Sequence, residues 1–275
     1  MTLAITGSTG AVGGLVARQL AALHPRLIVR DASRAPQLAG CDVAVATYAD
    51  GTAAERALAG IDVLFMVSAA ESEVRRDEHR SFIAAAARAG VGHVVYTSFA
   101  AAAADATFTL GRDHHDAEQA IRESGMAFTF LRDNFYADFV PYFADEHGVI
   151  RGPAGTGRFA AVARADVADV AAAVLRSPGD HVGAAYELTG PEAFTMAEAA
   201  ARAGAFLGRE MSYEEETLEE AYASRRAAYG APDWQLDAWV STYTAIADGS
   251  VEHVSDDVRR VTGNPPRTLE QALGG

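Results

Sequence analysis

The first 130 residues alternate short apolar segments with longer alanine-rich segments. The apolar segments carry many β-branched residues and are apolar throughout, which is typical of strands buried on both faces of a parallel sheet. The alanine-rich segments are long enough for helices of about two to five turns. The expected strands are 2–6, 26–30, 42–47, 61–67, 92–98 and 126–131, and the expected helices are 12–23, 52–59, 71–90 and 113–124. This alternation predicts a doubly wound parallel α/β sheet with right-handed crossovers.

The pattern changes after residue 131, where the aromatic segment "DNFYADFVPYF" is followed by a glycine-rich stretch. The expected elements are then a strand at 184–188, helices at 166–176, 195–207, 214–229 and 233–248, and two short helices separated by Pro265–Pro266. We therefore expect a nucleotide-binding core over 1–132 and a smaller α/β lobe over 133–275, with some core elements returning within 150–190. The cleft between the lobes is the expected ligand site.

Composition narrows the class of partner. The formal net charge of −14 argues against nucleic acid, because neutralising phosphates requires a basic face. The acidic run at 214–220 is interpreted as a solvated helix face. No apolar run reaches the roughly 18–20 residues that a membrane span needs, and a strand-like segment directly after Met1 leaves no room for a signal peptide. The single cysteine, Cys41, forms no internal disulfide, so a cytoplasmic location is expected.

A glycine motif directly follows the first expected strand. Gly7, Gly10 and Gly13 form G-x-x-G-x-x-G at the head of a helix, and a second strand begins about 20 residues on. A tight turn and close backbone approach to a pyrophosphate both require glycine, and the helix N-terminus offers unpaired N–H groups to the phosphates. The motif therefore predicts a dinucleotide site on a Rossmann-type fold.

The end of the second expected strand distinguishes NADP from NAD. An acidic residue at this place usually binds the ribose hydroxyls of NAD, whereas the 2′-phosphate of NADP requires a cation. The strand ends in Arg30, with Asp31 next and Arg34 one helical turn later. Because a guanidinium matches a phosphate in a two-pronged geometry, we predict NADP(H) as the cofactor. Asp31 is the competing residue, unless it caps the following turn.

The chain carries, in this order, the stretches "TGSTGAVG", "VRDASRA", "VVYTSFA" and "GRDHHDAEQAIRESGMAFTFLRDNFYADF". It thereby resembles the NmrA-like branch of the atypical short-chain dehydrogenases/reductases, and within that branch the bacterial NADPH-dependent quinone oxidoreductases. The resemblance covers essentially the whole chain, through "GPAGTGRFAAVARADVADVAAAVL" to "GNPPRTLEQAL".

The resemblance implies a function for several groups of residues. The pyrophosphate would lie on residues 7–13 and the 2′-phosphate on Arg30, while further cofactor contacts would come after the fourth and fifth strands. The implied cofactor-binding residues are Gly7, Ser8, Thr9, Gly10, Ala11, Val12, Gly13, Arg30, Ser68, Ala69, Thr97, Ser98, Phe99 and His114. The implied substrate-contacting residues are Phe99, Asn134, Phe135, Tyr136 and Phe139.

The chain departs from ordinary short-chain dehydrogenases at their Y-x-x-x-K motif. Aligned through "AEQAIRESG", it has Leu110 at the tyrosine position and His114 at the lysine position. The hydroxyl that protonates a reduced carbonyl is therefore missing, which argues against an ordinary alcohol dehydrogenase. Quinone reduction is less demanding, because hydroquinone oxygens are far less basic than an alkoxide. An aromatic-lined pocket suits a flat quinone.

Two functions stay open at this point. The first is an enzyme that passes hydride from NADPH to a quinone or related small electrophile, with His114 binding the ribose or relaying a proton, and Ser98 as a second candidate catalytic contact. The second is an NADP(H)-sensing regulator that binds a partner protein and catalyses nothing. An isoflavone- or ether-reductase-like activity is weaker, since that chemistry keeps the lysine. A monomer or homodimer is expected in either case.

The remaining histidines give no metal signal. Adjacent residues on a helix point about 100° apart, so His114 and His115 cannot address one metal. The resemblance implies that His114, at the lysine position, is the one that faces the cofactor. His79 is interpreted as a helix-surface residue and His93 as a strand-start residue, neither with a partner at metal-ligand spacing. No metal site is expected. Tyr96 is assigned to core packing, and capping of the next helix is the alternative for Asn134.

Overall fold

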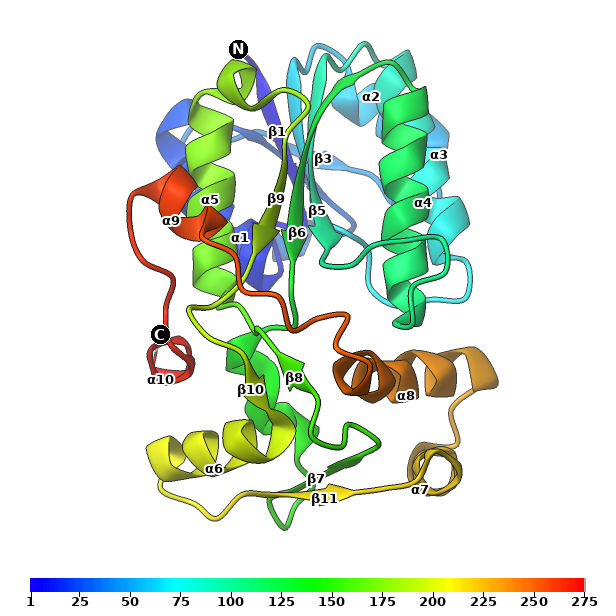
Figure 1. Ribbon diagram of the computed structural model, residues 1–275. Coiled ribbons are helices and arrows are strands. Elements are labelled where there is room, and N and C mark those ends of the chain that lie inside the picture. The colour runs from blue at the N-terminus through cyan, green and yellow to red at the C-terminus, as the bar shows by residue number, and fades with distance from the viewer. Residues whose placement is uncertain (275) are drawn as a thin grey trace. The chain divides into compact units, whose positions relative to one another are not determined.

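The computed structural model describes residues 1–274, and within them a seven-stranded parallel sheet has the strand order β3–β2–β1–β4–β5–β6–β9 (Figure 1). Its strands are β1 (Leu3–Thr6), β2 (Arg26–Val29), β3 (Val43–Val45), β4 (Val63–Met66), β5 (His93–Phe99), β6 (Ala127–Asp133) and β9 (Ala185–Leu188). Ile5 of β1 pairs with Leu27 of β2 and Phe65 of β4, and all three side chains are buried. The chain order reverses outward from β1, so the predicted doubly wound Rossmann-type sheet is confirmed.

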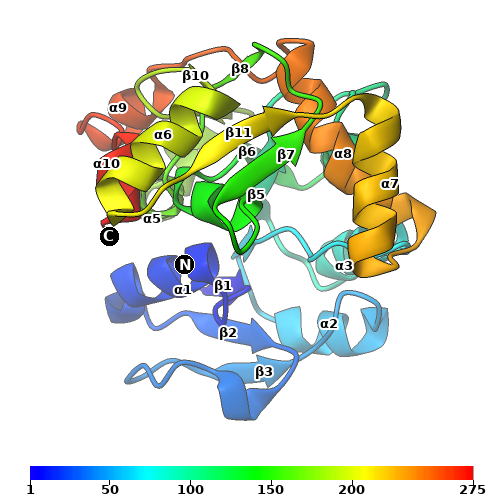
Figure 2. The ribbon, with the colours of Figure 1, turned by 90° about the horizontal axis from the view of Figure 1, so that it is seen from below.

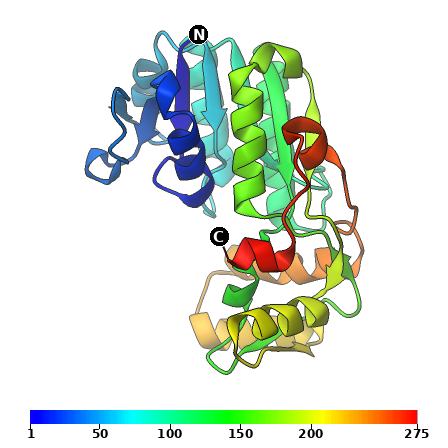
Figure 3. The same ribbon diagram turned by 90° about the vertical axis from the view of Figure 1, so that its left-hand side faces the viewer.

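Helices cover both faces of this sheet (Figures 1 and 3). One face carries α1 (Ala11–Gln19) and α5 (Arg164–Arg176), and the other carries α2 (Gly51–Leu58), α3 (Arg75–Arg88) and α4 (Thr109–Glu123). The core under α2, α3 and α4 is continuous, with aromatic side chains at its centre. This two-sided cover explains why the strands are apolar at nearly every position.

The chain divides into two compact units that interleave along the sequence. Unit 1 contains Met1–Phe99, Asp113–Arg132 and Val167–Tyr186, so it includes most of the sheet and of α5. Unit 2 contains Ala100–Arg112, Asp133–Asp166 and Glu187–Gly275. The chain therefore crosses from one unit to the other several times.

Unit 2 is built on two small sheets. β7 (Val149–Gly152) pairs in parallel with β11 (Ser212–Glu215), and β8 (Arg158–Phe159) pairs with β10 (Phe194–Thr195) (Figure 2). The helices of this unit are α6 (Met196–Leu207), α7 (Leu218–Tyr229), α8 (Asp233–Ala247), α9 (Asp257–Thr262) and α10 (Leu269–Leu273). Short 3-10 helices are η1 (Ala21–Leu23), η2 (Ala32–Arg34), η3 (Ala137–Phe143) and η4 (Pro178–His181), of which η3 belongs to this unit.

Several expected boundaries were wrong, and two of these differences affect residues singled out in the sequence. The segment 214–229 is not one helix, because 212–215 pairs with β7 and Thr217 begins α7 through a capping box with Glu220. The acidic run is thus shared between a strand and a helix, and Glu216 is buried against Arg225. The helix α4 starts at Thr109, a full turn before the expected 113, so His114 lies in its second turn.

Within residues 1–274, no helix is both long and apolar enough to cross a bilayer.

Candidate active site

The glycine loop between β1 and α1 is shaped by a left-handed turn at Gly7 and by a close approach of the backbone at Gly13. Gly7 has φ +65°, a left-handed conformation that side chains disfavour. A Cβ on Gly13 would lie 2.4 Å from the carbonyl oxygen of Gly7, so any side chain there collides with the turn. Only glycine at these positions lets α1 start this close to β1.

The start of α1 leaves polar groups available beside this loop. Gly10 is the N-cap of α1, and no side chain caps the helix. The Ser8 hydroxyl is buried and has no hydrogen-bond partner within residues 1–274. A buried hydroxyl without a partner carries a desolvation cost that a bound ligand would relieve. An uncapped helix N-terminus beside it suits a phosphate group, so the loop from Gly7 to Gly13 fits a dinucleotide pyrophosphate.

Arg30 and Asp31 have different surroundings at the end of β2. The Asp31 carboxylate accepts hydrogen bonds from the Ser33 backbone N–H at 2.9 Å and the Ser33 hydroxyl at 2.7 Å, and these bonds lower its pKa. It therefore caps η2. Arg30 is exposed, and no partner for its guanidinium is found in the described part of the chain. The cation is available to a ligand, while the carboxylate is used within the protein.

The segment after β4 is held through its backbone by three side chains. The Thr97 hydroxyl accepts the Ser68 N–H at 2.8 Å. His79 Nε2 accepts the Ala69 N–H at 2.9 Å, and Arg75 Nε donates to the Ala69 carbonyl oxygen at 3.0 Å. The expected cofactor-flanking residues Ser68 and Ala69 are thus positioned by β5 and α3.

His79 is buried, so its interpretation as a surface residue was wrong. Its side chain is held between the Tyr48 and Tyr96 rings at 5.8 and 5.9 Å, and burial lowers its pKa to about 3. Because Nε2 accepts a hydrogen bond, the ring proton sits on Nδ1, which has no partner within residues 1–274. Nothing in the local sequence pattern marks this residue as buried.

His114 lies at the centre of a second buried contact set. Its Nε2 is 3.1 Å from Arg75 Nη2, and its Nδ1 is 3.0 Å from the Tyr96 hydroxyl. Arginine only donates, so Nε2 must accept and Nδ1 carries the proton toward Tyr96. Burial, with the nearby Arg75 charge and His79, lowers the pKa of His114 well below its ordinary value. His114 is therefore a neutral histidine in the ordinary pH range.

Tyr96 contributes more than the expected core packing. Its side chain is fully buried, but its hydroxyl is bound to His114 on α4. Tyr96 and Ser98 lie two residues apart on β5, and both bond to α4. The regular alternation of a strand places them on this shared face.

Ser98 donates its hydroxyl proton to Glu118 at 2.7 Å, and both residues are fully buried. The Glu118 carboxylate also accepts from Arg132 at 2.7 Å and from Arg122 at 3.1 Å. A buried carboxylate with two guanidinium partners is a structural ion cluster. Sequence reasoning missed Glu118, although it follows His114 by four residues and so shares its helix face. The Ser98 hydroxyl, an expected catalytic contact, is thus bound inside this cluster.

Phe99 ends β5 with its side chain almost fully buried, 6.1 Å from the His114 ring.

The other expected substrate residues belong to unit 2. Asn134 is buried, and its amide donates to the Val251 carbonyl at 2.9 Å and accepts the Phe135 N–H at 2.7 Å. Its polar atoms therefore hold the backbone of unit 2.

The aromatic residues that follow Asn134 have separate environments. Phe135 packs edge-on against Phe108 at 5.2 Å. The Tyr136 hydroxyl donates to Asp133 at 2.6 Å, and burial raises its pKa well above the ordinary value. Phe139 is 44% exposed and stacks on Tyr142 at 5.2 Å. Of the expected substrate residues, Phe139 is thus the most exposed.

No group of three or more His, Cys, Asp or Glu side chains within residues 1–274 could hold a metal ion.

The buried histidines predict a loss of stability as the pH falls from 7 to 5. His79 titrates near pH 3 when folded and near 6.5 when unfolded, so below about 6.5 the unfolded chain binds the extra proton. Its contribution is complete above that pH and declines below it by up to about 1.4 kcal/mol per pH unit. We expect His79→Gln, which keeps an acceptor for Ala69, to reduce this slope in urea unfolding at pH 5, 6 and 7. His147→Gln, at a side chain 77% exposed, is the control and should leave the pH dependence of the unfolding free energy unchanged. Equal slopes in the wild type and both variants would contradict the prediction.

Several known proteins resemble this chain in sequence or in structure. A model of the family described as NAD(P)H-binding matches residues 7–178. Quinone oxidoreductase 2 of Escherichia coli is 34% identical, over 98% of this chain and 97% of its own length. The NAD(P)H azoreductase of Xenophilus azovorans is 33% identical, over 97% of this chain and 95% of its own. The crystal structure of the E. coli NADPH-dependent quinone oxidoreductase with NADPH superposes with a TM-score of 0.89 at 32% identity, covering 99% of each chain.

Proposed function

Because this chain belongs to the NAD(P)H-binding family, we propose that it is an NADPH-dependent reductase that transfers hydride to a quinone or a related small electrophile. Two relatives that match over nearly the whole chain, the NADPH-dependent quinone oxidoreductase and the NAD(P)H azoreductase, support this proposal. The observation that carries the choice of cofactor is the exposed Arg30, which has no partner within residues 1–274, beside an Asp31 whose carboxylate is already bound.

The protein's part is to bind and orient the cofactor. The loop from Gly7 to Gly13 and the free N–H groups of α1 would hold the pyrophosphate, with the Ser8 hydroxyl as an added donor. Arg30 would hold the 2′-phosphate, and Ser68 and Ala69 would flank the ribose. When bound, NADPH supplies the hydride.

Arg75 supplies the fixed positive charge that a dehydrogenase lysine would otherwise bring. The lysine position holds the neutral His114, but Arg75 of α3 donates to His114 Nε2 from 3.1 Å. It also holds the Ala69 carbonyl and forms an ion pair with Asp113 at 3.4 Å. One guanidinium thus holds the loop after β4 and the ring of His114. It also places a positive charge beside the proposed nicotinamide ribose site.

The same geometry argues against His114 as a proton donor. A buried imidazole whose pKa lies well below the ordinary value is not protonated near neutral pH, and its one ring proton is directed at Tyr96. Leu110 leaves the tyrosine position without a hydroxyl. The acceptor must therefore be reducible without an acid from these residues, which suits a quinone, because solvent can protonate the weakly basic hydroquinone oxygens. Phe99, whose ring lies 6.1 Å from the His114 ring at the end of β5, would border the substrate.

We expect the purified protein to oxidise NADPH when a simple benzoquinone or naphthoquinone is added, and to leave simple aldehydes and ketones unreduced. The rate of quinone reduction should show no inflection from His114 between pH 5 and 8, because this group does not change charge there. Stopped-flow absorbance of NADPH across this pH range, with a pH-independent quinone, is the measurement.

Two results would change the proposal. Tight NADPH binding without turnover of any quinone would favour the NADP(H)-sensing regulator over the enzyme. A bell-shaped profile that His114→Gln abolishes would restore His114 as the acid.

A further inference from the structure

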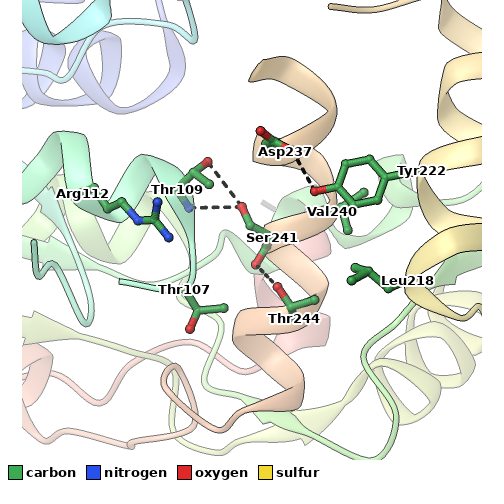
Figure 4. Close-up of a pocket in the computed structure, with 9 residues that line it drawn as sticks. All are labelled: Thr107, Thr109, Arg112, Leu218, Tyr222, Asp237, Val240, Ser241 and Thr244. Carbon is green, nitrogen blue, oxygen red and sulfur yellow. Dashed lines mark hydrogen bonds between the residues drawn. The ribbon is translucent and has the colours of Figure 1, made fainter. Parts of the chain in front are cut away.

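A separate pocket lies wholly within unit 2 (Figure 4). Its volume is about 330 Å³, within the size range of small-molecule sites. One wall comes from the start of α4 and the residues before it, the floor from α8, and the opposite wall from α7. The residues that line it are Thr107, Thr109, Arg112, Leu218, Tyr222, Asp237, Val240, Ser241 and Thr244. None of them belongs to the cofactor or substrate residues described above.

Arg112 is the cationic group of this pocket. Its Nε donates to the Ala106 carbonyl oxygen at 2.8 Å, which fixes the direction of the side chain. Its two terminal nitrogens have no partner within residues 1–274, so four N–H donors are available. A guanidinium held in this way matches a carboxylate through two parallel hydrogen bonds.

Most of the other polar groups that line the pocket are already bound within the protein. Asp237, across the pocket, accepts the Tyr222 hydroxyl proton at 2.7 Å, and the pKa of Tyr222 is raised to about 12, so that tyrosine stays a donor. Thr107 gives its proton to Asp248, which leaves its oxygen as an acceptor. The Ser241 hydroxyl is bound to the Ala238 carbonyl and the Thr109 N–H. Among the lining residues, Arg112 therefore offers the most unused hydrogen-bond donors.

The side of the pocket opposite Arg112 carries apolar surface beside Asp237. Leu218 is 52% exposed, and in Figure 4 Leu218 and the Tyr222 ring lie on the other side of Ser241 from the guanidinium. Val240 of α8 extends this apolar surface at the floor. An exposed leucine at the mouth of a polar pocket gains contact area when a ligand carries an apolar body.

We propose that this pocket binds a small carboxylate with an apolar body, such as an aromatic or branched-chain acid. The carboxylate lies on the terminal nitrogens of Arg112, and the apolar part lies along Leu218, Val240 and the Tyr222 ring. Inorganic phosphate can bind the Arg112 guanidinium but has no apolar part to contact Leu218 and Val240, so it binds more weakly than such an acid. The site is independent of the proposed reductase activity, and each can fail without the other.

The test is titration calorimetry of the full chain with benzoate as the probe, repeated with benzamide and with inorganic phosphate. We expect benzoate to bind, benzamide and phosphate to bind more weakly, and saturating NADPH to leave benzoate affinity unchanged. R112Q should weaken benzoate at least tenfold, and Leu218→Ser, at an exposed position, several-fold. The matched control is Arg209→Gln, since Arg209 of unit 2 also makes only a backbone bond, to Pro141, outside this pocket.

Four outcomes overturn the proposal. The first is that benzoate does not bind at concentrations up to about 10 mM, and the second is that R112Q binds benzoate as tightly as the wild type does. The third is that NADPH displaces benzoate. The fourth is that phosphate binds as tightly as benzoate and that Leu218→Ser does not change benzoate affinity. Thermal unfolding of each variant, measured without ligand, separates loss of the site from loss of the fold.

Discussion

Replacing Arg30 with alanine is expected to weaken NADPH binding about 100-fold while leaving NADH affinity nearly unchanged. The guanidinium is exposed and has no partner within residues 1–274, so its removal costs the fold little. The 2′-phosphate is present only in NADPH, and it would lose two charge-assisted hydrogen bonds at once. Fluorescence titration of both cofactors with wild type and variant measures the change in preference.

The control for this experiment is Arg56→Ala, an exposed arginine of α2 that also lacks a partner in the described residues. It removes the same net charge, so a long-range electrostatic effect would appear in both variants. If Arg30→Ala keeps the NADPH preference of the wild type, the cofactor assignment loses its main support. Asp31→Ala would then be the next variant, although its carboxylate is bound to Ser33.

Replacing Arg75 with glutamine is expected to lower the free energy of unfolding by about 2–4 kcal/mol and to weaken NADPH binding at least tenfold. The side chain is almost fully buried, and its loss leaves the Ala69 carbonyl and His114 Nε2 without their donor. Since the charge of Arg75 helps to lower the pKa of His114, that pKa should also rise. Urea unfolding, cofactor titration and NMR of the histidine ring protons measure the three effects.

Arg76→Gln is the matched control, because Arg76 is the next residue and shares the partner Asp113 at 2.6 Å. Its side chain is 50% exposed, so this substitution should cost less than about 1 kcal/mol and leave NADPH binding unchanged. Arg75→Lys should keep part of the cofactor affinity if charge is what matters there. Equal effects at positions 75 and 76 would reduce Arg75 to an ordinary ion-pair residue.

The elements of the sheet and the turn at the glycine motif could be predicted because their signals are local. Apolar runs with β-branched residues indicate buried strands, and the spacing of Gly7, Gly10 and Gly13 reflects steric demands within seven residues. Arg30 was predicted as a ligand of the 2′-phosphate from a local signal too, since it directly follows β2, and this role stays a prediction. Boundaries were less certain where a partner from elsewhere decided the structure, as at 212–215, which becomes a strand because it pairs with β7.

The sequence alone determined the fold class, the glycine loop and the available cation at position 30, because each depends on neighbours along the chain. Only the tertiary structure decided the states of His79, His114 and Arg75. Their protonation and direction depend on burial and on partners 10 to 39 residues away, such as the Ala69 backbone and the guanidinium beside His114. The histidine at the lysine position could be identified from the sequence. That this histidine is neutral, and that the positive charge of Arg75 lies beside it, follow from the packing of α3 and α4 against β5.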